Sequence, residues 1–248
     1  MPSTRRKSIA RVALGGVVAA FMAIELSLPA AAADRPKDPS EIWPQQVGIT
    51  YNALPCVAGG PSAQDAATAA ALNPQLQNKM RGYMNAYNTS CARAVVQAVK
   101  NRGLNERAAA IAIATTIVET SIANLDGGDA TSVGLYQQQN SWGSFAERTN
   151  PTWATNKFLA VMESFYPNGS WNTAPIGDVA ADVQRPAAQY RYRYAEQAND
   201  AVVIAHRIWS EISRHGSSVS GDGKADIVTV LDNGDVKAWR NGAGFAQM

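Results

Sequence analysis

The chain has 248 residues, 46% of them hydrophobic, as expected for one globular domain with an appendage. The formal net charge at pH 7 is +2 and no lysine-rich tract occurs, which argues against nucleic acid as a partner. Two histidines and two cysteines are too few to favour a zinc site or a nucleophile built on histidine or cysteine. No cofactor is indicated, because neither common glycine-rich phosphate loop is present.

Residues 1–33 have the pattern of a secretory signal peptide. Basic residues between positions 5 and 11 precede the apolar run "VALGGVVAAFMAI", and Ala31 and Ala33 fit an A-x-A cleavage site. An uncleaved anchor is the alternative, but the run is shorter than the ~20 residues that span a bilayer. We therefore expect a secreted protein that starts at Asp34 and has no stable membrane insertion. Without its leader the chain carries a net charge of −1.

The two cysteines, Cys56 and Cys91, both follow the leader. In an oxidising compartment a single disulfide between them is the default expectation. Residues 34–71 are rich in proline, glycine and polar residues, so they are predicted to form an irregular arm, which Cys56 would tie to the body.

The body, residues 72–213, is predicted to be mainly α-helical. The run "ERAAAIAIATTIVETSIANL", with Asn105 as a possible N-cap, predicts a central helix of about five turns that is apolar on every face and therefore buried. A loop follows over 126–144. Other helical patterns cover residues 75–86, 90–101 with Ser90 as N-cap, 151–165, 176–184 and 189–213.

The tail, residues 217–248, changes character. Two alternating β-branched runs flank a "DNGD" turn, which is the pattern of a β-hairpin. Ser217 to Ser220 form the predicted linker.

Glu119 lies near the end of the central helical run, on the stripe that also holds Ile111 and Thr115. A carboxyl group that points at an apolar wall loses solvation, which raises its pKa and keeps it protonated near neutral pH. A protonated carboxyl is what a glycosidic leaving oxygen needs from a general acid. The alternative is that Glu119 only begins the polar end of the helix, in water.

The string "VETSIANL" followed by "TSVGLYQQ" resembles the motif of the lysozyme-like superfamily, in particular lytic transglycosylases and secreted bacterial lysozyme-like domains. In that motif a catalytic Glu and a Ser or Thr end a helix, and S-x-G-L-x-Q follows a short loop. The later "VQRPAAQYRYRY" resembles the Gln and Tyr segment that closes the cleft in such domains. The resemblance covers residues 72–213 and implies a lysozyme-like fold around the central helix, with Glu119 as the catalytic acid.

The resemblance also implies a substrate and a set of residues that contact it. The substrate is peptidoglycan, cut at the β-1,4 bond between N-acetylmuramic acid and N-acetylglucosamine. Amides pair with hydroxyl and acetamido groups, and aromatic faces cover sugar rings. The residues expected to bind the glycan are Ser132, Gly134, Tyr136, Gln137, Gln138, Trp142, Gln184 and Tyr190, with Tyr194 as a further candidate. Core packing is expected instead for Gln139, Trp153, Trp171 and Trp209.

The type of cleavage is left open by the sequence. A lytic transglycosylase works with one Glu and yields a 1,6-anhydro product, whereas a hydrolase needs a second carboxylate. Asp126 and Asp129 both lie in the following loop; Asp129 is the tentative second catalytic residue, and a surface turn is the simpler explanation for Asp126.

The tail resembles a single FG-GAP or VCBS repeat, whose loop binds calcium in such repeats. Asp222 and Asp226 match that loop, but Ser218 and Ser220 stand at two positions where the repeat has calcium ligands. Asp222 and Asp226 are therefore weak calcium candidates, and no bound metal is expected. One repeat cannot close a propeller, so the tail is a truncated array or a short docked hairpin.

The main expectation is thus a monomeric, exported, peptidoglycan-cleaving enzyme. The rival hypothesis is a protein that binds cell-wall glycan, or acts in adhesion, without cutting.

Overall fold

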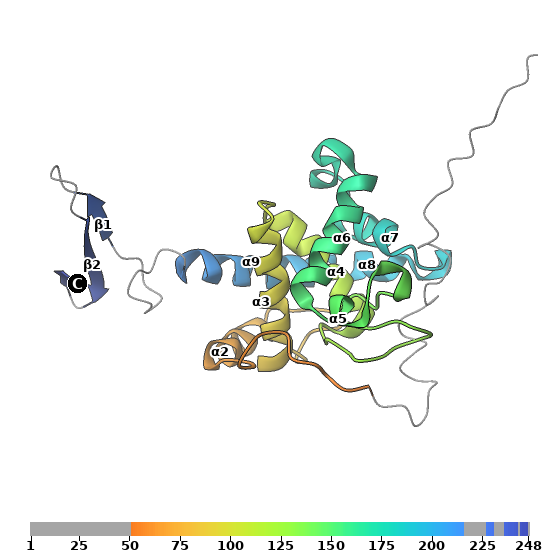
Figure 1. Cartoon of the computed structure of the whole chain (residues 1–248), viewed down its shortest axis with the longest axis horizontal. Helices are drawn as coiled ribbons and strands as arrows, with labels where there is room; N and C mark the ends of the chain where they lie inside the picture. The colour runs from red at the N-terminus through yellow and green to blue at the C-terminus, as the bar shows by residue number, and fades with distance from the viewer. Residues whose placement is uncertain (1–50, 216–226, 231–235, 243, 248) are drawn as a thin grey trace, which may run out of the picture.

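A computed structural model describes residues 51–215, 227–230, 236–242 and 244–247. Over 51–215 the chain forms a mainly α-helical domain (Figure 1). No helix among the described residues is long and apolar enough to cross a membrane. The α-helices are α2 (Ala63–Leu72), α3 (Ala86–Asn101), α4 (Glu106–Thr120), α5 (Phe145–Arg148), α6 (Pro151–Phe165), α7 (Ile176–Gln184), α8 (Tyr192–Glu196) and α9 (Ala198–His215).

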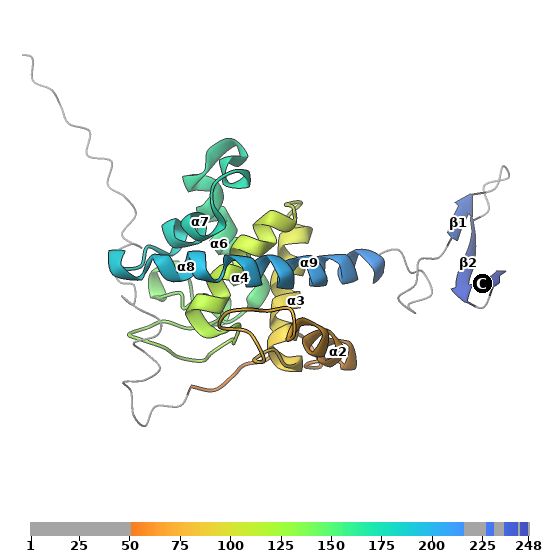
Figure 2. The same cartoon turned by 180° about the vertical axis from the view of Figure 1, so that it is seen from behind.

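Helix α4 is the buried centre of the domain, as the sequence predicts. The Asn105 side chain caps its start by accepting from the backbone N–H of Ala108, and every residue from Ala108 to Thr120 is buried. Helices α3, α6, α7, α8 and α9 all contact it, and α9 runs across it in the view of Figure 2. A helix that is apolar on every face is stable only when it is enclosed in this way.

The central helix is shorter than predicted. It ends at Thr120, because Ser121 and Ile122 both adopt left-handed backbone conformations, with φ of 56° and 61°. The Thr120 hydroxyl also accepts from the backbone N–H of Ala123 at 3.1 Å. The segment "SIANL" is therefore a turn that leads the chain away from the helix end, and Glu119 lies in the last helical turn.

Helix α2 lies inside the stretch 34–71 that was predicted to be irregular, so that prediction is wrong for residues 63–71. Ser62 and Asp65 form a capping box, in which each side chain accepts from the other residue's backbone N–H. This S-x-x-D signal outweighs the surrounding glycine and proline residues.

The helix predicted over 75–86 is also absent, since residues 74–85 form turns. The carboxylate of Asp200 on α9 accepts from the backbone N–H groups of Gln77 and Asn78, both at 2.9 Å, which fixes these turns. Helix α3 begins at Ala86, capped by Asn85, rather than at Ser90. The predicted helix 189–213 is divided into a 3-10 turn at Ala188–Tyr190, α8 and α9.

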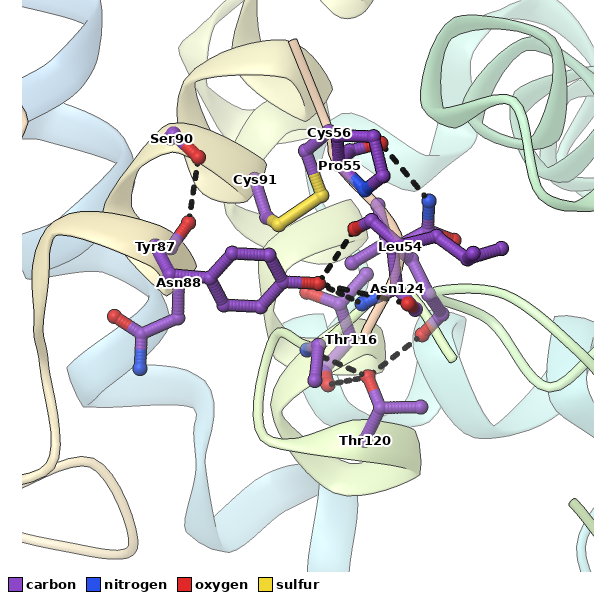
Figure 3. The surroundings of a disulfide bond; sticks show 12 residues. Leu54, Pro55, Cys56, Tyr87, Asn88, Ser90, Cys91, Thr116, Thr120 and Asn124 are labelled. Atoms are coloured by element: carbon purple, nitrogen blue, oxygen red, sulfur yellow. Dashed lines mark hydrogen bonds between the residues drawn. A yellow bond between two sulfur atoms is a disulfide. The ribbon is translucent and has the colours of Figure 1, made fainter. Parts of the chain in front are cut away.

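The predicted disulfide between Cys56 and Cys91 is present, with 4.9 Å between the two Cα atoms. Figure 3 shows that it joins the segment before α2 to helix α3. In the same view the Tyr87 hydroxyl donates to the carbonyl of Leu54 at 2.8 Å and accepts from the backbone N–H of Asn124 at 3.1 Å. This cluster ties residues 54–56 to the chain that follows α4.

The tail contains three short strands, β1 (Ile227–Val230), β2 (Val236–Gly242) and β3 (Gly244–Gln247). They pair antiparallel in the order β1-β2-β3, with Ile227 opposite Trp239 and Trp239 opposite Gln247. The predicted signal peptide, the predicted linker Ser217 to Ser220, and the calcium candidates Asp222 and Asp226 lie outside the described residues.

Candidate active site

Glu119 is a buried carboxyl group, with a relative exposure of 4%. Its Oε1 accepts two hydrogen bonds, from Gln184 Nε2 at 2.6 Å and from the Tyr194 hydroxyl at 2.7 Å. Gln184 is the last residue of α7 and Tyr194 lies in α8. Side chains from α7 and α8 therefore meet at one oxygen atom of the Glu119 carboxyl group on α4.

Gln184 also joins Glu119 to the loop that follows it. The same Nε2 donates to the carbonyl of Tyr136 at 3.0 Å, and Gln184 is 1% exposed. Thr120, next to Glu119, donates from its hydroxyl to the carbonyl of Leu135 at 3.1 Å. Residues 135–136 are thus held against the end of α4 by two separate hydrogen bonds.

The C-terminal end of α4 has a cation. Lys79 Nζ donates to the carbonyl of Ile117 at 2.9 Å and to that of Val118 at 3.2 Å. The last carbonyls of a helix carry partial negative charge and lack partners within the helix, so an ammonium group stabilises them. Lys79 was not identified from the sequence, because the contact depends on the turns of 74–85 rather than on any local motif.

Arg148 holds the loop 126–144 together. It is 4% exposed, and its guanidinium donates to the carbonyls of Gly143, Ser144, Thr131 and Gln138 and to Oδ1 of Asn140. Burial lowers the pKa of this guanidinium below its usual value. Sequence reasoning missed Arg148; the only available signal was a charged residue in a short helix after a polar loop.

Gly134 has a backbone role. Its φ of +77° lies in the left-handed region, and a Cβ atom there would be 2.1 Å from the carbonyl oxygen of Arg148. Its N–H donates to the carbonyl of Leu125 at 2.7 Å. Glycine is therefore required here by both conformation and space.

The side chains of Tyr136, Gln137 and Gln138, expected to bind glycan, point into the protein. Tyr136 is fully buried, stacks on Phe158 with 5.1 Å between ring centroids, and donates to Thr155; burial raises the pKa of its phenol. Gln137 Nε2 donates to the carbonyls of Gly127 and Gly134. Gln138 Nε2 donates to the carbonyl of Ala154 at 3.2 Å. In this conformation the three side chains shape the loop, and the carbonyl of Tyr136 is the group that contacts Gln184.

The other expected glycan contacts are placed differently. Ser132 is 1% exposed and its hydroxyl has no hydrogen-bond partner among the described residues. Trp142 is 7% exposed, in a short 3-10 helix. The Tyr190 ring lies 4.8 Å from the guanidinium carbon of Arg193, and the tyrosine that donates to Glu119 is Tyr194, the less certain of the two from the sequence. Among the residues expected to pack, Gln139 and Trp171 are buried, and Trp153 and Trp209 are partly buried against the core.

The two loop aspartates have distinct surroundings. Asp126 accepts from the backbone N–H and from Nδ2 of Asn52, at 2.8 and 2.7 Å. Asp129, the tentative second catalytic residue, is exposed, and its carbonyl accepts from the backbone N–H of Ser132. Within the described part of the chain, no group of three or more His, Cys, Asp or Glu side chains could hold a metal ion.

No model of a known protein family matches this chain, and no curated protein matches it either. The class that the described fold defines is a mainly α-helical domain with a carboxyl group buried at the end of its central helix.

Proposed function

We propose that this protein cleaves peptidoglycan strands at the β-1,4 bond between N-acetylmuramic acid and N-acetylglucosamine, with Glu119 as the general acid. The observation that carries the proposal is the buried Glu119 carboxyl, whose Oε1 accepts from both Gln184 and Tyr194. The resemblance of the sequence around these three residues to lysozyme-like enzymes supplies the substrate.

The geometry suits proton donation by one defined oxygen. Because Oε1 already accepts two hydrogen bonds, a proton on this carboxyl belongs on Oε2. The two donors fix the rotation of the carboxyl group, so Oε2 keeps one direction, as a general acid must within hydrogen-bond reach of the leaving oxygen. After the bond breaks, the same carboxylate takes up a proton from the attacking hydroxyl.

We favour the transglycosylase route, in which the muramoyl C6 hydroxyl attacks and a 1,6-anhydro product forms. A hydrolase needs a second carboxylate near the first. Of the two candidate second carboxylates, Asp126 is engaged with Asn52 and Asp129 is exposed.

We also propose that the protein is exported and monomeric and acts at the cell wall. The Cys56–Cys91 disulfide supports export, since such bonds persist mainly in oxidising compartments.

The test replaces the acid by its amide. Glu119→Gln keeps the shape and can still accept at Oε1, but it has no proton to transfer. We expect turnover on peptidoglycan to fall roughly 100-fold or more while glycan binding, measured by calorimetry, is retained. The matched control is Glu106→Gln at the other end of α4, where the carboxylate contacts the exposed His206. Undiminished turnover in a folded Glu119→Gln variant would leave the non-catalytic glycan-binding hypothesis as the better account.

A further inference from the structure

Residues 51–56 pair with the chain that leaves the end of α4. The backbone N–H of Leu54 donates to the carbonyl of Asn124 at 2.7 Å, and that of Asp126 donates to the carbonyl of Asn52 at 3.0 Å. Between them, Ala53 and Leu125 form an antiparallel bridge. The segment 51–56 thus lies antiparallel beside residues 124–126 through an isolated bridge, although Asn52 and Asp126 are 74 positions apart in the sequence.

Side chains reinforce this pairing at its open end. The Asp126 carboxylate receives both the backbone N–H and Nδ2 of Asn52, at 2.8 and 2.7 Å. The Tyr51 hydroxyl donates to the carbonyl of Gly128 at 2.8 Å. The Tyr51 ring lies so close to Gly127 that a Cβ atom there would be 2.3 Å from a ring carbon. The loop backbone after Asp126 is therefore fitted to the residues at 51 and 52.

Residues 124–126 also bond to the part of the loop that precedes Leu135 and Tyr136. Asn124 and Asp126, on either side of Leu125, bond to the segment 51–56. The carbonyl of Leu125 itself accepts from the backbone N–H of Gly134 at 2.7 Å. The carbonyls just beyond, of Leu135 and Tyr136, accept from Thr120 and Gln184 respectively. Hydrogen bonds and the short backbone stretch 134–136 thus connect Asn52 to Gln184, the amide that holds Glu119.

The segment has a second, independent attachment at residues 54–56. Cys56 is bonded to Cys91, and Leu54 accepts from the Tyr87 hydroxyl. Losing the Asn52 contact should therefore release the 51–52 end while the rest of the segment stays in place. The contact itself is exposed, and exposed polar pairs contribute little to overall stability.

We propose that Asn52 and Asp126 are positioning residues for the active site. The segment 51–56 forms an outer wall that keeps Leu135 and Tyr136 in register with Gln184 and Glu119. Asp126 thereby holds the loop and is not the second carboxylate of a hydrolase. The catalytic part of this inference rests on the proposed function, whereas the structural part, that the wall orders the loop, does not.

The test exchanges the two side chains. Asn52→Asp places two carboxylates face to face and should lower kcat on peptidoglycan about tenfold, with KM and the melting temperature nearly unchanged, because small displacements near a site cost rate more than stability. Adding Asp126→Asn should restore most of kcat. The amide at position 126 can then accept from the N–H of residue 52 and donate to the new carboxylate there. The matched control, Asn199→Asp on the exposed face of α9, should leave kcat unchanged.

Hydrogen exchange gives a readout that needs no activity. The amide protons of Asp126 and Gly134 should exchange several-fold faster in Asn52→Asp and return to wild-type rates in the double variant. Unchanged exchange, or a double variant no better than the single one, would overturn the inference even if Glu119→Gln proves inactive. If the wild-type protein cuts no glycan, the proposed function fails, while exchange still decides whether the wall orders the loop.

Discussion

At the scale of single residues, the site depends on polar side chains that donate hydrogen bonds to backbone carbonyls as well as to Glu119. Gln184 joins Glu119 to the carbonyl of Tyr136, Lys79 covers the carbonyls at the end of α4, and Arg148 gathers the loop. A buried carbonyl that loses its donor costs free energy, because no water replaces the lost bond. These residues should therefore be sensitive to substitution although none of them reacts.

Arg148→Met should destabilise the fold. Its loss removes the donor at 2.6 Å from the Thr131 carbonyl and the donor at 2.8 Å from the Gln138 carbonyl, which keeps the backbone N–H of Val133 at 3.1 Å. Burial lowers the pKa of Arg148, which means that the buried charge itself is unfavourable, and removing it offsets part of the loss of hydrogen bonds. We expect a net loss of about 2–4 kcal/mol of unfolding free energy. Urea unfolding measures it, with Arg81→Met at an exposed site as the control. A loss below about 0.5 kcal/mol would show that Arg148 does not hold the loop.

At the scale of elements, the close approach of two helices brings the site's hydrogen-bond donors together. A Cβ atom on Gly177 of α7 would lie 2.4 Å from the Cα and 2.5 Å from the N of Ala195 in α8. Because α7 carries Gln184 and α8 carries Tyr194, this contact sets how both donors meet Glu119.

Gly177→Ala should separate α7 from α8. We expect a loss of about 1–3 kcal/mol of unfolding free energy, from overpacking, together with reduced turnover. Adding Ala195→Gly should not restore either property, since the nearest atoms are backbone. Thermal melting and turnover of both variants check this. Full recovery in the double variant would mean that the side chain of Ala195, not its backbone, limits the approach.

Helix α2 is attached by a charged contact that should make the fold sensitive to acid. The Asp65 carboxylate, 2% exposed, accepts from Arg93 Nε and Nη2 at 2.8 and 2.6 Å. Burial raises the pKa of Asp65, but the hydrogen bonds from Arg93 and then from Ser62 outweigh it, so the pKa lies below its ordinary value. The stabilisation is then present above the unfolded-state pKa of about 3.9 and is lost as pH falls through the folded-state pKa.

Asp65→Asn should therefore lower the melting temperature at pH 7. It should also make the melting temperature decrease less steeply as the pH is lowered below about 4. The neutral amide has no proton to gain on acidification and leaves Arg93 without its carboxylate. Melting curves between pH 7 and pH 2 check this, with Glu196→Gln at an exposed site as the control. Parallel curves for the wild type and Asp65→Asn would contradict the assignment.

At the scale of the whole molecule, the features predicted correctly are those with local signals. The buried central helix, its Asn105 cap, the approximate positions of α6 and α7, and the disulfide follow from periodicity, capping and cysteine count. The inward direction of Tyr136, Gln137 and Gln138 could not be predicted, because Arg148 and the backbone of 124–134 decide it. The pairing of 51–56 with 124–126 likewise depends on contacts between distant parts of the chain.

The central claim, that Glu119 cuts glycan by acid catalysis, is tested most directly by mass spectrometry of the fragments released from purified cell-wall sacculi. We expect the wild-type protein to release fragments with 1,6-anhydromuramoyl ends and Glu119→Gln to release roughly 100-fold fewer. Reducing ends in place of anhydro ends would keep the acid but contradict the transglycosylase route. Equal release by Glu119→Gln and the wild type, or no release by a folded wild-type protein, would contradict the claim itself.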